Sequence, residues 1–187
     1  MSIFDDPWSA NKRHKTYVSF HHDNDQHYRD RLEAISSDYF EVIASRSIPS
    51  GETFSGKSEE TIRQIIRDDY LRDSEVTVVL IGEETWQRQH VDWEIAASIR
   101  ETQYSPNSGL IGILLPTYKA PSDSEFNPKS LPTRLEKNLS NGFAKLYKWS
   151  ENPEEIQQWI HEAFQRRNKL KPDNTEPNFV DNRTTNS

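Results

Sequence analysis

The sequence contains no cysteine among its 187 residues. This absence excludes a disulfide framework, a thiolate metal site and a cysteine nucleophile. The sequence also lacks an apolar run of about 18 residues, the length that a membrane-spanning helix needs. Its first residues, MSIFDDPWSANKRHK, lack the apolar core of a secretory signal. We therefore expect a soluble protein located in the cytoplasm.

Acidic residues outnumber basic ones, which gives the chain a formal net charge of −7. Sequence-independent binding to nucleic acid draws its affinity from neutralised phosphates, so an acidic chain is a poor candidate for it. Two short basic clusters, at residues 12–15 and 166–169, have simpler explanations as a solvated arm and as favourable charge at the C-terminal end of a helix. We expect neither nucleic acid nor a membrane among the partners.

Short β-branched and aromatic stretches alternate along the chain with stretches of helical periodicity. Strands are predicted at residues 15–20, 39–44, 75–81, 110–115 and 144–149. Helices are predicted at residues 26–36, 58–70, 85–100 and 152–168. The runs TVVLI and LIGILL in the third and fourth strands are apolar without alternation, which is typical of strands covered on both faces. This order predicts an α/β fold with a mostly parallel five-stranded sheet and helices on both faces.

The chain is expected to form one domain with two irregular ends. Residues 1–14 are predicted to be a flexible leader, residues 15–168 the domain and residues 169–187 a disordered tail, because the tail is rich in Asn, Thr, Pro and charge. An irregular insert is expected at about 117–142, with a weak helical pattern near 131–139. Asn152 is the predicted N-cap of the last helix, with Pro153 at its first position.

In parallel sheets, ligands bind outside the carboxyl ends of the strands, so the loops that follow the strands are the candidate site. The first of these loops supplies the polar residues Ser19, His21, Asp23 and Asn24. Such side chains can hold ribose hydroxyls or a phosphate, although loops after strands are polar in any case. The loop at 45–57 contains two glycines that can act as hinges, and its composition resembles that of a lid.

The helix predicted at 85–100 carries a carboxylate at an informative position. Val91, Ile95 and Ile99 form its apolar stripe, and Glu94 lies about 100° around the helix from the centre of that stripe. Glu94 can therefore face a cleft, or it can be an ordinary solvated acid. Trp93 lies nearly opposite the stripe, and an exposed tryptophan indicates an interface or a cover from another segment.

Several motifs that would define other activities are missing. The sequence contains no GxGxxG, P-loop, GxSxG or HExxH motif, and its acidic residues and histidines show no metal-ligand spacing. A phosphoacceptor domain of the receiver type is rejected, because Ile81 and Gly82 end the third strand where the acceptor aspartate should stand. We expect no metal.

Three stretches of the chain resemble one known family. The runs TYVSFHHDND, SEVTVVLIGEETW and HVDWEIAASI are similar to the TIR-like family of bacterial Thoeris antiphage defence, and the similarity covers roughly residues 15–149. The resemblance implies a flavodoxin-like, TIR-like parallel five-stranded sheet. It also implies an NAD⁺ glycohydrolase or ADP-ribosyl cyclase, with NAD⁺ as substrate and no other cofactor. The product would be an ADP-ribose-derived signal that activates a separate effector protein.

The resemblance also assigns roles to individual residues. Glu94 would be the catalytic carboxylate that assists cleavage of the bond between nicotinamide and ribose. Phe20 and His21 would form the wall and rim of the pocket, and Asp23 and Asn24 would lie on its ribose or phosphate side. The resemblance further implies self-association of the active protein, because a neighbouring copy often completes the site.

One position departs from the family pattern. Many TIR enzymes have a tryptophan four residues before the glutamate, whereas this chain has His90 there. His90 can stack on a base or carry a proton, or it can mark a site that has lost its activity. The alternative function is therefore an inactive TIR-like interaction module that recruits partners through the loop at 45–57 and the tryptophan-bearing helix.

Overall fold

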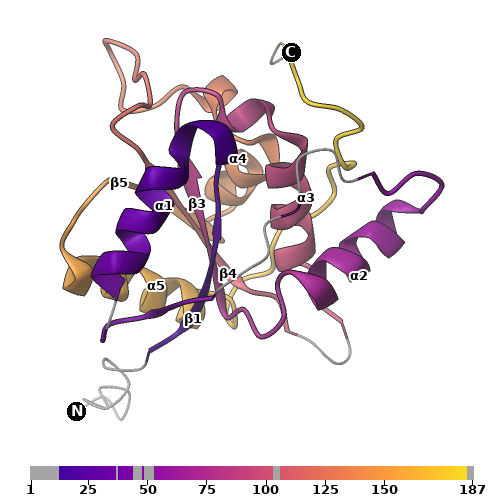
Figure 1. Ribbon diagram of the computed structural model, residues 1–187, viewed down its shortest axis with the longest axis horizontal. Helices are drawn as coiled ribbons and strands as arrows, with labels where there is room; N and C mark the ends of the chain where they lie inside the picture. The colour runs from indigo at the N-terminus through magenta and orange to yellow at the C-terminus, as the bar shows by residue number, and fades with distance from the viewer. Residues whose placement is uncertain (1–12, 37, 44–47, 49–52, 103–105, 185–187) are drawn as a thin grey trace.

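A parallel sheet forms the centre of the protein (Figure 1). The computed structural model describes residues 13–36, 38–43, 48, 53–102 and 106–184. Within them the sheet has five strands in the order β2-β1-β3-β4-β5, all parallel. The strands are β1 (Lys15–Ser19), β2 (Glu41–Val42), β3 (Val76–Ile81), β4 (Gly109–Leu114) and β5 (Ala144–Lys148). The predicted α/β architecture is confirmed, and the strand order is the flavodoxin-like one.

Helices cover both faces of the sheet, as parallel connections require. They are α1 (His22–Ser36), α2 (Glu59–Asp69), α3 (Gln89–Ser98), α4 (Thr133–Ser140) and α5 (Pro153–Arg166), with short 3₁₀ turns at Thr85–Gln87 and Pro128–Ser130. Helices α1 and α5 pack on one face, and α2, α3 and α4 lie on the other (Figure 1). Neighbouring residues of β3 point to opposite faces, so Val78 and Val79 belong to different apolar cores.

Two helix boundaries differ from the prediction. Helix α1 begins at His22 and not at residue 26, because the polar run after β1 forms a first helical turn. The amide of Asp25 donates to the carbonyl of His21 at 2.8 Å. Acidic side chains in this turn interact favourably with the positive N-terminal end of the helix dipole. The helix predicted at 85–100 is instead a 3₁₀ turn followed by α3, with Arg88 extended between them.

The C-terminal region is more ordered than its composition suggested. The insert expected to be irregular contains α4, whose buried residues include Arg134 and Leu135. Residues 169–187 were expected to be disordered, but residues 169–184 are described and bond to α3 and α4. That expectation was wrong because buried polar side chains of the domain bind the backbone of this segment. Residues 1–12 of the expected leader and most of the loop at 45–57 lie outside the described residues.

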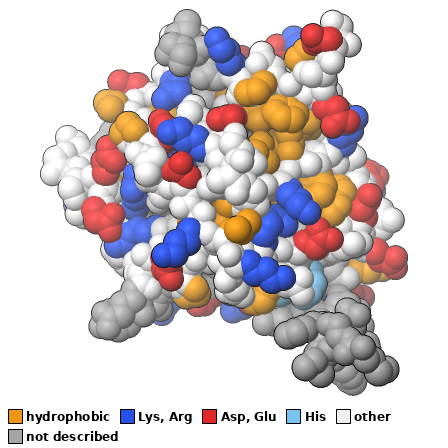
Figure 2. Space-filling model, turned by 180° about the vertical axis from the view of Figure 1, so that it is seen from behind, with side chains coloured by type: hydrophobic (Ala, Val, Ile, Leu, Met, Phe, Trp, Pro, Cys, Tyr) orange, Lys and Arg blue, Asp and Glu red, His pale blue; other side chains and the backbone are white. Residues whose placement is uncertain are grey.

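The face shown in Figure 2 carries basic and acidic side chains that are interspersed with one another. An interspersed pattern of this kind provides no basic stripe for a phosphate backbone on that face. Among the described residues, no helix is both long enough and apolar enough to span a bilayer.

The N-cap of α5 provides a test of local stability. The side chain of Asn152 accepts from the amides of Glu154 and Glu155, at 3.0 and 3.4 Å, which confirms the predicted cap. Replacing Asn152 by alanine is expected to lower the free energy of unfolding by about 1 kcal/mol, because these amides lose their partner. Urea denaturation measures the change. Asn152→Asp should retain most of the stability, and an equal loss in both variants would contradict the capping role.

Candidate active site

The candidate site lies where β1 and β3 end, at the switch point of the strand order. Ser19 is the last residue of β1, and its hydroxyl donates to Oε2 of Glu94 at 2.5 Å. Both side chains are fully buried. Helix α3 therefore places the carboxyl group of Glu94 at the end of β1. Ligands bind at this edge in parallel sheets of this kind.

The environment of Glu94 changes its acidity. Burial raises the pKa of Glu94 to about 7, although hydrogen bonds from Ser19 and Tyr17 and from the backbone of Ile48 act in the opposite direction. A carboxyl group with such a pKa exchanges protons near neutral pH, and groups of this kind are concentrated at functional sites. Glu94 is neither an ordinary solvated acid nor open to a cleft in this conformation, because its exposed fraction is 0%.

Three aromatic rings lie close together where β1 ends. The ring of Phe20 lies 4.6 Å from that of His22, and the ring of His22 lies 4.5 Å from that of His90. Nε2 of His90 lies 3.1 Å from the carbonyl oxygen of Phe20. Since a carbonyl oxygen only accepts, Nε2 carries the proton in this bond. The structure thus brings Phe20 and His90 together.

The protonation of His90 provides a second test. Burial lowers the pKa of His90 to about 4, with the Phe20 hydrogen bond opposing the change. Between about pH 4 and pH 6.5 the unfolded chain binds the proton more tightly, so His90 contributes a loss of stability as the pH falls through this window. We expect the His90 ring signals in ¹⁵N–¹H NMR spectra to shift only near pH 4. A midpoint near pH 6.5 would contradict the enclosed, neutral ring.

The other residues expected from the first loop form a polar rim. Nδ2 of Asn24 donates to Oε2 of Glu84 at 2.9 Å, and Nε2 of His21 lies 3.7 Å from the same oxygen. Asp23 lies 3.6 Å from the guanidinium of Arg88. His21, Asp23 and Asn24 are therefore held in place by residues that follow β3.

The sequence analysis missed the contributions of Glu84 and Arg88. Both lie in the segment between β3 and α3. Glu84 belongs to the loop after the third strand, and Arg88 falls within the helix that was predicted at 85–100. The extended backbone of Arg88 turns this segment toward the first loop. Gly82 and Thr85 after the third strand were the available hint, because glycine and threonine are frequent in a turn before a helix.

A second buried carboxyl group, that of Asp25, lies beneath the end of β3. Its exposed fraction is 2%, and burial raises its pKa while hydrogen bonds with Thr117 and Thr85 act in the opposite direction. A Cβ atom added to Gly82 would lie 2.6 Å from Oδ2 of Asp25. A side chain at position 82 would thus force the carboxyl group of Asp25 to shift.

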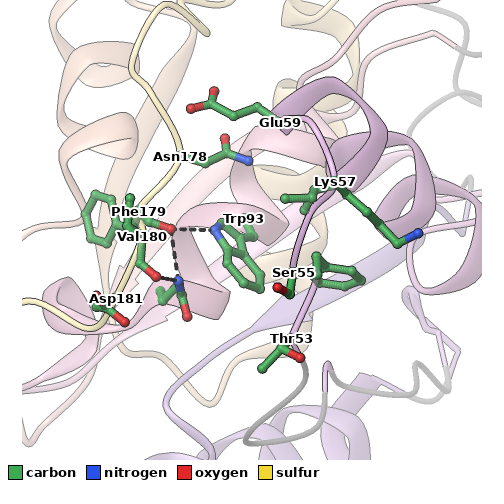
Figure 3. A pocket seen from close by; sticks show the side chains of 12 residues that line it. Thr53, Ser55, Lys57, Glu59, Trp93, Asn178, Phe179, Val180 and Asp181 are labelled. Atoms are coloured by element: carbon green, nitrogen blue, oxygen red, sulfur yellow. Dashed lines mark hydrogen bonds between the residues drawn. The ribbon is translucent and has the colours of Figure 1, made fainter.

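Trp93 is covered by another segment, which is one of the two explanations that its helical position left open. Its exposed fraction is 7%, its ring meets that of Phe54 edge-on at 5.2 Å, and its indole nitrogen donates to the carbonyl of Phe179 at 2.9 Å. A cavity of about 390 Å³ lies between residues 53–59, α3 and the C-terminal segment. In Figure 3, Asn178 and Phe179 approach Trp93 from one side, and Thr53, Ser55 and Lys57 face it from the other.

Among the residues that the structure describes, no group of three or more histidine, aspartate or glutamate side chains is arranged to hold a metal ion.

A sheet in the order 2-1-3-4-5, with a buried glutamate on the helix after its third strand, defines a TIR-like α/β domain. The family model of the TIR-like domain of the Thoeris protein ThsB matches residues 17–120. The chain belongs to this family and is a TIR-like protein of antiphage defence. No curated protein matches the chain. The matched range contains every residue of the candidate site and ends before α4 and the C-terminal segment.

Proposed function

We propose that the protein cleaves NAD⁺ at the bond between nicotinamide and ribose and makes an ADP-ribose-derived signal for antiphage defence. The observation that carries this proposal is the buried carboxyl group of Glu94 at the end of β1, bonded by Ser19 and with its pKa raised to about 7. A group that is desolvated in this way, at the ligand-binding edge of the sheet, is a candidate for direct action on a substrate.

The reaction suits a single carboxylate. As the glycosidic bond breaks, its electron pair leaves with nicotinamide, which becomes neutral, and positive charge develops on the ribose. An ionised carboxylate beside the ribose stabilises this oxocarbenium character and accepts hydrogen bonds from the sugar hydroxyls. The positive charge of the substrate also favours the ionised form of Glu94, because an opposite charge lowers the pKa of a carboxyl group. Water, the adenine base or an amino group then takes the open position on the ribose.

The surrounding residues have roles that follow from their chemistry. Phe20 and His21 form the wall and rim, and Asp23 and Asn24 face the ribose or phosphate side. His90 stacks on a base, since a ring that is neutral at pH 7 is better suited to stacking than to carrying a proton. Arg88 supplies the positive charge that a pyrophosphate requires.

The test compares wild type with Glu94→Gln in cells, with and without phage infection, and follows NAD⁺ and ADP-ribose derivatives by mass spectrometry. We expect a new ADP-ribose derivative from wild type and its loss, by about 10²-fold or more, in Glu94→Gln. Glu101→Gln makes the same chemical change at an exposed carboxyl group and should keep the product. Equal product from Glu94→Gln would remove Glu94 from the chemistry.

The full enclosure of Glu94 and the presence of His90 favour a second candidate, an inactive TIR-like interaction module. The same experiment separates the two functions. If folded wild type makes no product under any condition, the interaction module is the better description. We further propose that the active enzyme self-associates, and sedimentation of the protein from infected and uninfected cells measures this.

A further inference from the structure

An extended C-terminal segment, residues 172–184, lies across α3 and α4 and beside α2 (Figure 1). We refer to it as the strap. Its first contact is with Asn138 of α4, whose side chain donates to the carbonyl of Asp173 and accepts from the amide of Asp173, both at 2.8 Å. Nδ2 of Asn174 then donates to the carbonyl of Ala96 in α3 at 2.9 Å. The domain thus binds largely to the backbone of the strap.

The centre of this contact is a buried guanidinium. Arg134 is fully buried and pairs with Asp92 of α3 at 3.1 Å. It also donates to Oδ1 of Asn174 at 2.7 Å and to the carbonyls of Glu176 and Pro177 at 2.9 and 3.3 Å. Buried carbonyls need donors, and Arg134 supplies them. This surface of α3 and α4 is therefore built to receive an extended peptide.

The strap bonds to the two residues that immediately precede Glu94. The amide of Phe179 donates to Oδ2 of Asp92 at 2.9 Å. The carbonyl of Phe179 accepts from Nε1 of Trp93 at 2.9 Å and from Nε2 of Gln89 at 3.0 Å (Figure 3). These bonds fix the position of Trp93 on the outer side of α3.

Trp93 connects the strap to the cover of Glu94. The ring of Trp93 packs on Phe54, and both belong to one apolar cluster with Tyr17 and Ile48. The side chain of Tyr17 and the backbone of Ile48 both act to lower the pKa of Glu94, so they lie beside its carboxyl group. A continuous set of contacts therefore runs from Phe179 through Trp93 to the groups that enclose the carboxyl group.

The strap is held by hydrogen bonds more than by apolar burial. Phe179 is buried, whereas the exposed fraction of the neighbouring Val180 is 84%. Nδ2 of Asn178 is buried beside the cavity and has no hydrogen-bond partner, which is a cost to the docked state. Segments with few apolar contacts open at lower free energy than the core does, so the strap can leave while the sheet stays folded.

We propose that this surface is a peptide-binding site which the chain fills with its own strap, and that departure of the strap releases Trp93 and uncovers Glu94. The consequence for activity rests on the proposed NAD⁺ chemistry, whereas the control of access to Glu94 does not. The strap would then keep the enzyme inactive until an activating partner displaces it.

The test uses the full chain and two ways of changing the strap. The main-chain amide of Gln89 donates to Oδ1 of Asn182 at 2.9 Å. The two positions are therefore adjacent, and the pair Gln89→Cys and Asn182→Cys is expected to form a disulfide that locks the strap. The chain has no other cysteine. Phe179→Ala weakens the docked strap, and Val180→Ala is its exposed control. Hydrogen exchange is measured at residues 53–57 and 89–98, with β3 as the reference for global unfolding.

We expect Phe179→Ala to speed hydrogen exchange at residues 53–57 by about tenfold or more. This is the effect of an equilibrium constant for local opening that is about ten times larger. The oxidised double-cysteine variant should slow this exchange, reduction should reverse the effect, and Val180→Ala should match wild type. With NAD⁺ added, Phe179→Ala should be active without infection, and the oxidised variant inactive until it is reduced.

The outcomes separate the two proposals. Unchanged exchange at residues 53–57 in both strap variants would overturn the inference, whatever happens to NAD⁺. Faster exchange in Phe179→Ala without cleavage of NAD⁺ by any variant would support the strap and count against the enzyme. If Phe179→Ala also loses protection in β3, the comparison of the oxidised and reduced double-cysteine variant decides.

Discussion

Replacing Glu94 by glutamine is expected to stabilise the folded protein at pH 8, although it removes the proposed catalytic group. Burial raises the pKa of Glu94 from 4.5 to about 7, so the folded state binds a proton more tightly than the unfolded chain. The contribution of Glu94 to stability is fully present below about pH 4.5 and is lost as the pH rises through 7. A shift of this size corresponds to about 3 kcal/mol.

Glutamine keeps the shape of the side chain and carries no charge, so this pH dependence should vanish in the variant. We expect Glu94→Gln to raise the free energy of unfolding by about 1–3 kcal/mol at pH 8 and to leave it nearly unchanged at pH 4.5. The lower limit allows for the buried amide group, which must still find partners; the Ser19 hydroxyl can donate to its oxygen. Urea denaturation at both pH values measures the two differences.

The matched control is Glu101→Gln, which makes the same change at an exposed position and should alter stability little at either pH. A loss of stability in Glu94→Gln at pH 8 would show that the ionised carboxylate is well accommodated in the folded protein. It would also remove the main physical reason for treating Glu94 as a group held ready for a cationic substrate. A gain of stability together with a loss of product is the pattern of a site whose function costs stability.

Most of the sheet and part of the site could be predicted from the sequence. Strands β3 and β4 are continuous apolar runs, and the cap of α5 is a local signal, so both were predicted from short windows. Ser19 was expected at the ligand-binding edge because the carboxyl ends of parallel strands meet there. The grouping of Phe20, Glu94 and His90 in one site was expected from the resemblance to the family.

The surroundings of Trp93 and the path of the strap could not be predicted in this way. Trp93 lies nearly opposite the apolar stripe of α3, so periodicity predicts an exposed side chain. Phe179, which covers it, is distant in sequence. The strap is polar and rich in proline, and its order comes from donors such as Arg134 that bind its carbonyls. The composition of a segment describes only its own side chains. It does not reveal hydrogen-bond donors that another element supplies to the backbone of the segment.

Replacing Arg134 by methionine is expected to lower the free energy of unfolding by about 3–5 kcal/mol, because it removes one member of a buried ion pair. The exposed fractions of the Arg134 and Asp92 side chains are 0% and 2%. Burial already raises the pKa of Asp92, and the charge of Arg134 is the largest influence in the opposite direction. Without Arg134, Asp92 must take up a proton or remain charged and unpaired, and two strap carbonyls lose their donor.

Urea denaturation of Arg134→Met should be compared with that of Arg31→Met, which breaks an exposed pair with Glu151 at 2.9 Å. The exposed variant should lose little stability, because solvent screens its charges. Adding Asp92→Asn to Arg134→Met should recover part of the loss, because the double variant leaves no buried charge. A loss in Arg134→Met as small as that in Arg31→Met would mean that water reaches the pair, and the strap would then not be anchored on a buried charge.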